Sequence, residues 1–264
     1  MKRKLSLLKS SMVVLSTVAT LSVFQAKAAE ENVMSYLPSV SELYTSVNSM
    51  GIGADWKKTV KVTSKNYDGM DEIERAFEVG TTLSDVAFVL STLEKGEKPD
   101  DKILLEAEKA ISSLNPGSET LSRLERMRSM VGSGKLEPAA MREELDALVS
   151  QIFPALRGNK DIQDAANLAL AAASFKVMYL GADSVSGLKE PSKEQLGMFR
   201  WSSIARYFKE YFENEAGDKF KNSDTVKTFV AAISEIEPLI GKAPGKIAKQ
   251  DIEQVRDYLA AVYQ

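Results

Sequence analysis

The sequence predicts an all-α protein, a bundle of about eight to ten helices. Nearly every segment repeats its apolar residues with a period near 3.6, which is typical of amphipathic helices. The β-branched residues are scattered, and no run alternates between apolar and polar residues as a strand does. Gly, Pro, Asn and Asp separate the apolar segments, at positions where helices are expected to begin and end.

Residues 1–28 have the features of a signal peptide. A basic start precedes an uncharged, mostly apolar run at residues 12–24, and residues 26–28 fit the small-x-small pattern of a cleavage site. The run is shorter than the roughly 20 residues that span a bilayer, although an uncleaved membrane anchor is the alternative. No cysteine is present, so the chain is not a lipoprotein. We expect a periplasmic or secreted protein, residues 29–264, without stable membrane insertion.

Cleavage changes the charge balance. Five of the 34 basic residues lie in the signal peptide, so the mature chain has 29 basic and 37 acidic residues, a formal net charge of −8. Nucleic acid and anionic lipid attract basic patches, so we expect no nucleic-acid partner. Without cysteine, stability must come from the core alone, and a chain of this length can bury a core of sufficient size.

Five helices are expected before the sequence Gly-Ser-Gly at residues 132–134. Asp68 is the expected cap of the third helix, because its carboxylate can accept from the free amides of the first turn. Asp100 and Asp101 suit the positively charged start of the fourth helix, and Ser118 begins the fifth. The expected ranges are 40–50, 55–62, 68–94, 103–114 and 118–131.

Five more helices are expected after this joint. Pro138 and Pro191 stand in first turns, where a helix tolerates proline, and Pro154 is expected to kink or end the helix that contains it. The small-residue run at 165–174 permits close packing of helices and is expected in the core. The expected ranges are 138–156, 161–186, 191–214, 224–240 and 249–263.

The mature chain is expected to form a single all-helical domain, residues 29–264, with two halves at 68–157 and 158–264. Each half contains a long helix with an acid near its middle, Asp85 in one and Asp183 in the other. The residue matches are poor, and helical hairpins resemble each other by chance, so duplication and coincidence both stay open. We expect the two long helices to pack together.

Asp85 and Asp183 stand in the two most apolar helices, and burial is expected for both. A buried carboxylate must be paired, hydrogen-bonded or neutral, because burying it alone costs several kcal/mol. One interpretation is structural pairing, in which case Asp85→Ala should lose roughly 3–5 kcal/mol and Asp85→Asn less. The other is a polar point in a ligand pocket. The basic residues available for pairing are Arg75, Lys176, Arg200 and Arg206.

Residues 198–212 contain six of the chain's twenty aromatic residues. Phe199 and Phe212 lie off the main apolar stripe of this segment, with Arg200 and Arg206 between them. One interpretation is a wide buried face, and the other is an exposed aromatic–arginine groove for a partner or small ligand. The residues of the stripe, which are expected in the core, are Trp201, Ile204, Phe208 and Tyr211.

One stretch carries a resemblance to a known group of proteins. Its sequence is AFEVGTTLSDVAFVLSTLEKGEK, with Gly80, Asp85 and Leu90 at the matching positions. It resembles an uncharacterised family of exported, all-helical bacterial proteins, in which a small-residue helix carries Gly and Asp before a charged turn. The resemblance implies a helical bundle and an exported location, and it brings no known activity.

The absence of histidine and cysteine excludes several classes of catalytic and metal-binding site. Ser-His-Asp relays, His-ligated metals and haem, thiolate nucleophiles and iron–sulfur clusters are excluded, and no glycine-rich phosphate loop is present. We therefore expect no catalytic residue, metal or cofactor. The sequence favours a binding or protein-interaction module whose partner is a protein or a small apolar ligand. The alternative is a carboxylate-based enzyme, or a ligand-binding protein, with a pocket near Asp85 and Asp183.

Overall fold

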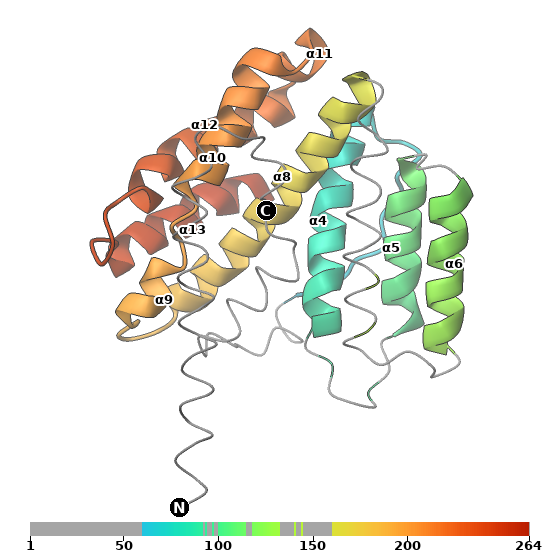
Figure 1. The fold of residues 1–264 in the computed structure, drawn as a ribbon, viewed down its shortest axis with the longest axis horizontal. Coiled ribbons are helices and arrows are strands. Elements are labelled where there is room, and N and C mark those ends of the chain that lie inside the picture. Colours follow the sequence, from blue (N-terminus) through green and yellow to red (C-terminus); the bar gives the residue numbers. More distant parts are fainter. Residues whose placement is uncertain are drawn as a thin grey trace, which may run out of the picture. The chain divides into compact units, whose positions relative to one another are not determined.

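The computed structural model describes residues 60–91, 100–114, 118–132 and 160–263, together with the isolated positions 93, 97, 140 and 144. Within these ranges the regular elements are helices and no strand is present, so the all-α prediction is confirmed (Figure 1). The predicted signal peptide lies outside the described residues, and so do the predicted helix 40–50 and nearly all of 138–156.

The described elements follow the predicted order. They are α4 (Glu72–Ser91), α5 (Asp101–Ser113), α6 (Ser118–Gly132), α8 (Lys160–Ser186), α9 (Lys193–Gly197), α10 (Ser202–Glu210), the π-helical turn η2 (Tyr211–Glu215), α11 (Asp218–Lys221), α12 (Asp224–Ile240) and α13 (Lys249–Tyr263). Residues 60–67 are irregular, so the last residues of the predicted helix 55–62 were assigned wrongly.

The start of α4 differs from the prediction that Asp68 caps it. Asp71 is the cap instead, because its Oδ1 accepts from the backbone amides of Ile73 at 2.8 Å and Glu74 at 2.9 Å. Asp68 lies in the turn before the helix. Asp100 caps α5 by accepting from the backbone amide of Lys102 at 3.0 Å.

The single helix predicted over 191–214 is broken in the structure. Ser192 and Gln195 form a capping box that starts the short α9. Helix α9 ends at Gly197, residues 198–201 lie outside any helix, and α10 begins after Trp201, where φ is −107° and ψ is 27°. This break turns Phe199, which lies between the two helices, into the core.

The long helices α4 and α8 pack closely along each other, as expected. A Cβ atom placed on Gly80 would lie only 2.0 Å from the carbonyl oxygen of Ala169, so only glycine permits this approach. Asp85 then meets Lys176 further along both helices, which shows that they run in the same direction. Figure 1 shows α5 and α6 next to α4 on one side.

The core has an aliphatic and an aromatic part. The aliphatic part joins α4, α5 and α8 and includes Val79, Val86, Leu90, Leu104, Ile111 and Ala169. The aromatic part joins α4 and α8 to the C-terminal helices and includes Phe77, Phe175, Phe208, Phe212 and Phe229. Among the described residues, one helical stretch, 162–186 in α8, is long and apolar enough to cross a membrane, and most of it is buried in this core.

Candidate functional site

The Asp85 cluster lies where α4, α8 and α13 meet. We define it as Asp85, Lys176, Tyr179, Tyr263 and Lys65. The Nζ atom of Lys176 is 3.9 Å from Oδ1 of Asp85, and the two side chains are only 13% and 16% exposed. The structure thus selects Lys176 from the four basic residues that the sequence offered as partners for Asp85.

The Lys176 ammonium also faces two aromatic rings. Its Nζ atom lies 5.1 Å from the ring centroid of Tyr263 and 5.5 Å from that of Tyr179. Both distances are within the range of cation–π attraction. The cation is therefore shared between a carboxylate and two ring faces.

Lys65 reaches the cluster from the irregular segment before α4. It forms an ion pair with Glu78, which lies two turns before Asp85 in α4. Burial lowers the pKa of Lys65, the charge of Asp85 opposes this effect and the charge of Lys176 adds to it. The charge of Lys65 thus acts on Asp85 in addition to that of Lys176.

Burial dominates the electrostatics of Asp85. It raises the pKa of the Asp85 carboxyl from the ordinary value of 3.8 to about 6, although the charges of Lys176 and Lys65 act in the opposite direction. Burial, helped by the charge of Asp85, raises the pKa of the Tyr263 hydroxyl well above 10. Asp85 is therefore a carboxyl group that titrates near neutral pH, and its two lysine partners compensate its charge only in part.

Asp183 does not belong to this cluster, and its predicted burial is wrong. Its side chain is exposed, and its charge acts on Arg256 of α13. Ala182 and Val185, its near neighbours in sequence, are buried. Successive residues of a helix point about 100° apart, so apolar neighbours do not imply a buried position.

Five of the six aromatic residues of 198–212 are buried, so they form the wide buried face rather than an exposed groove, while Tyr207 and the predicted core residue Ile204 are half-buried. Phe199 is 2% exposed and Phe212 is 1% exposed, so the groove interpretation is wrong. Phe199 packs beneath Gly181 of α8. Arg206 is exposed and pairs with Glu237 of α12 at 2.8 Å, while Arg200 is half-buried.

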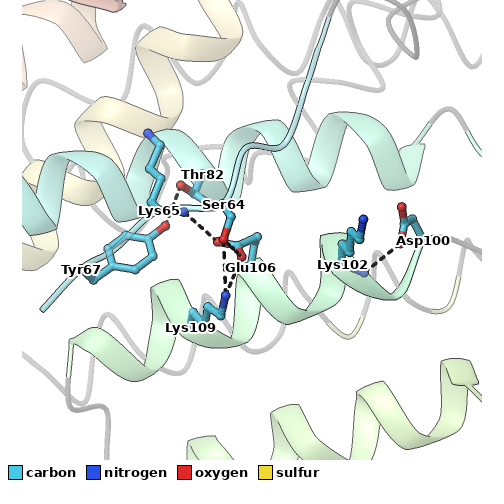
Figure 2. Close-up of polar contacts among 8 residues, drawn as sticks. All are labelled: Ser64, Lys65, Tyr67, Thr82, Asp100, Lys102, Glu106 and Lys109. Atoms are coloured by element: carbon cyan, nitrogen blue, oxygen red, sulfur yellow. Dashed lines mark hydrogen bonds and ion pairs between the residues drawn. The ribbon is translucent and has the colours of Figure 1, made fainter.

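Glu106 of α5 is a buried acid that we did not predict. Its carboxylate accepts from Ser64 Oγ at 2.7 Å, from the Lys65 amide at 3.2 Å and from Lys109 Nζ at 2.8 Å (Figure 2). Burial alone would raise the pKa of Glu106, but these hydrogen bonds outweigh it and hold the pKa below its ordinary value. The hydroxyls of Tyr67 and Thr82 form a hydrogen bond of 2.8 Å, which is also drawn in Figure 2.

Ser64 and Lys109 do not form a catalytic serine–lysine pair. Such a pair needs an uncharged lysine that accepts the serine proton. Here the Ser64 hydroxyl donates to Glu106, and Lys109 is ion-paired with the same carboxylate and lies 3.5 Å from Ser64 Oγ. We therefore interpret Ser64, Glu106 and Lys109 as a structural hydrogen-bond network that holds the irregular segment against α5.

Asp164, in the first turns of α8, is fully buried and was also missed. It accepts from the Tyr211 hydroxyl at 2.5 Å and from the Gly217 amide at 2.8 Å. Burial and the neighbouring Asp164 raise the pKa of Tyr211. A Cβ on Gly217 would lie 3.2 Å from the carboxylate. These contacts fasten the end of η2 to the start of α8.

Comparisons of the chain with models of known families, with curated proteins and with solved structures found no match. The resemblance of residues 76–98 to an exported helical family therefore stays a prediction. In the part of the chain that the structure describes, no group of three or more acidic residues is placed to hold a metal ion.

Proposed function

We propose that this protein is an exported, all-helical binding module without catalytic chemistry. The Asp85 cluster would be the polar element of its site for a protein partner or a small apolar ligand. Export is supported by the features of residues 1–28 and by the acidic mature chain. The all-α fold and the packing of the Asp85 cluster support its role as a binding module.

The observation that carries this proposal is that the Asp85 side chain is only 16% exposed, while the ammonium paired with it lies 3.9 Å away. Glu106 and Asp164 accept hydrogen bonds at 2.5–3.2 Å, as expected of buried acids with a structural role. Among the described residues, the nearest basic nitrogen to Asp85 is 3.9 Å away, and burial raises the pKa of the Asp85 carboxyl to about 6. Polar groups that serve a function are often kept at the expense of stability.

The surroundings of Asp85 favour binding over catalysis. A glycosidase-type mechanism needs a second carboxylate at about 5–10 Å. Asp183, the second acid that the sequence offered, is exposed, and its charge acts on Arg256. Within the described part of the chain, the charges that act most on Asp85 are those of the two lysines of the cluster. A carboxyl group with two neighbouring lysines in apolar surroundings is suited to bind a polar group on an otherwise apolar ligand or partner.

Native mass spectrometry of protein purified from the envelope or medium of its own host tests the proposal. We expect the wild-type chain to carry a bound species of defined mass, and Asp85→Asn to lose it. Asp183→Asn is the matched control, because it makes the same chemical change at an exposed position of α8, and it should retain the species. A wild-type protein without bound species, or equal retention by Asp85→Asn, would contradict the proposal.

N-terminal sequencing of the exported form tests the localisation separately. We expect it to begin at or within a few residues of Ala29. A full-length chain that stays with the membrane would contradict export.

A further inference from the structure

The last residue of α13 is the point at which this helix is fastened to α4 and α8. The Tyr263 ring stacks on Phe77 of α4, with ring centroids 5.6 Å apart. Its hydroxyl donates to the backbone carbonyl oxygen of Ala172 in α8 at 2.7 Å. Its ring also lies 5.9 Å from that of Tyr179. One side chain thus joins the end of α13 to both central helices.

The contacts of Tyr263 are coupled electrostatically to Asp85 through Lys176. The Lys176 ammonium lies 3.9 Å from the carboxylate and 5.1 Å from the centre of the Tyr263 ring. Asp85 is also close enough for its charge to act on the Tyr263 hydroxyl. A change in the charge of Asp85 must therefore affect the packing of Tyr263.

We propose that the charge state of Asp85 controls how stably the end of α13 packs, and we call this device the Asp85 latch. Protonation of the Asp85 carboxylate stabilises the packing of Tyr263 on α4 and α8, and ionisation destabilises it. The latch works within the folded molecule and does not require the cluster to bind a ligand. In acid the last turn of α13 is held closed, and near neutral pH it opens more often to water.

The direction follows from the groups that face Asp85. In the part of the chain that the structure describes, these are Lys176 of α8, Tyr263 of α13, and Lys65 and Tyr67 of the irregular segment. The two lysines favour the ionised form, but desolvation outweighs them in the closed state.

Because the Lys176 ammonium lies against both Asp85 and the Tyr263 ring, we expect opening of the last turn to admit water to the carboxylate. The closed state therefore binds the proton with a pKa of about 6, and the opened state with a pKa nearer the ordinary 3.8. The ionised form consequently favours opening. From about pH 5 to about pH 8, this difference raises the opening equilibrium constant by about tenfold.

Hydrogen exchange measured by mass spectrometry tests the latch. Protection factors, corrected for the intrinsic pH dependence of exchange, are compared between about pH 5 and about pH 8 for peptides from the end of α13. We expect wild-type protection to fall by about tenfold across this range, with a midpoint near 6. Peptides from Leu104 to Ile111 of α5 serve as an internal reference and should not follow this profile.

Two variants separate Asp85 from other titrating groups. Asp85→Asn is neutral at every pH, so its protection should not change with pH, and at about pH 8 it should exceed that of the wild type even at about pH 5. Asp183→Asn should keep the wild-type profile. A flat profile in the wild type, or an unchanged one in Asp85→Asn, overturns the proposal. A carbon-13 titration of the Asp85 carboxyl provides a second measurement, and a midpoint near 4 would overturn it as well.

Discussion

Replacement of Gly80 by alanine adds one methyl group at the closest contact between α4 and α8. The new carbon would lie 2.0 Å from the carbonyl oxygen and 2.7 Å from the carbonyl carbon of Ala169. Ordinary contacts of this kind begin at 3.4 Å. The obstacle is the backbone of a central, buried helix, so no side-chain rotation can relieve it. The two helices must move apart by about 1.4 Å.

The cost of this separation can be worked from two opposing effects. Overpacking of a well-packed core costs about 1–3 kcal/mol, and a clash with backbone belongs at the upper end of this range. Alanine in place of glycine in a helix interior returns about 1 kcal/mol through its higher helix propensity. We therefore expect Gly80→Ala to lower the free energy of unfolding by about 2 kcal/mol, and the Tm by about 4–8 °C.

Thermal melts followed by circular dichroism check this value. Gly181→Ala in α8 is the matched control, because a Cβ there would lie 3.5 Å from the Phe199 ring, an ordinary contact. This variant should be as stable as the wild type, or more stable by up to about 1 kcal/mol. If Gly80→Ala melts at or above the wild-type temperature, the helices do not approach each other as described.

Three further predictions follow from the buried polar groups, each measured by thermal or denaturant unfolding. Asp85→Asn should raise the free energy of unfolding by about 1–3 kcal/mol at about pH 8 and by less at about pH 5. The reason is that the protonated carboxyl, with its raised pKa, stabilises the wild type in acid, and this stability is lost as pH rises through about 6. A large loss of stability at about pH 8 would contradict this. Glu106→Gln should cost about 2 kcal/mol near neutral pH, and the cost should disappear as pH falls through the lowered pKa of Glu106. Tyr211→Phe should cost about 2 kcal/mol by removing the hydroxyl that donates to buried Asp164, whereas Tyr258→Phe, at an exposed residue, should cost almost nothing.

The helices were predictable because each carries its own apolar stripe and its own end signals. The ranges of α5, α12 and α13 agree with the prediction to within two residues at each end. The breaks around α9 and α10 were not predictable, since they depend on how deeply Phe199 packs beneath Gly181. Local sequence determines a helix, whereas the tertiary contacts determine where an aromatic segment must leave it.

The candidate site was predictable only in part. Asp85 was identified from its apolar context, but the choice of Lys176 depends on the relative register of two helices far apart in sequence. That register is set at Gly80 and Ala169, a contact that no local pattern shows. For Asp183 the apolar context was misleading. The helical stripe would have helped with Glu106, which lies three residues after Ile103 and four before Ala110 on the buried face of α5.

Asp85 and Glu106 show why burial alone does not assign a role to an acid. Both are carboxylates on neighbouring helices, yet burial raises the pKa of Asp85, whereas hydrogen bonds hold the pKa of Glu106 below its ordinary value despite burial. Near neutral pH, Glu106 therefore stabilises the fold, and Asp85 costs stability. An asparagine would fit the position of Asp85 without that cost. The ionisable oxygen at Asp85 is thus best explained by something the folded protein does with it, whether that is binding a partner or setting the position of α13.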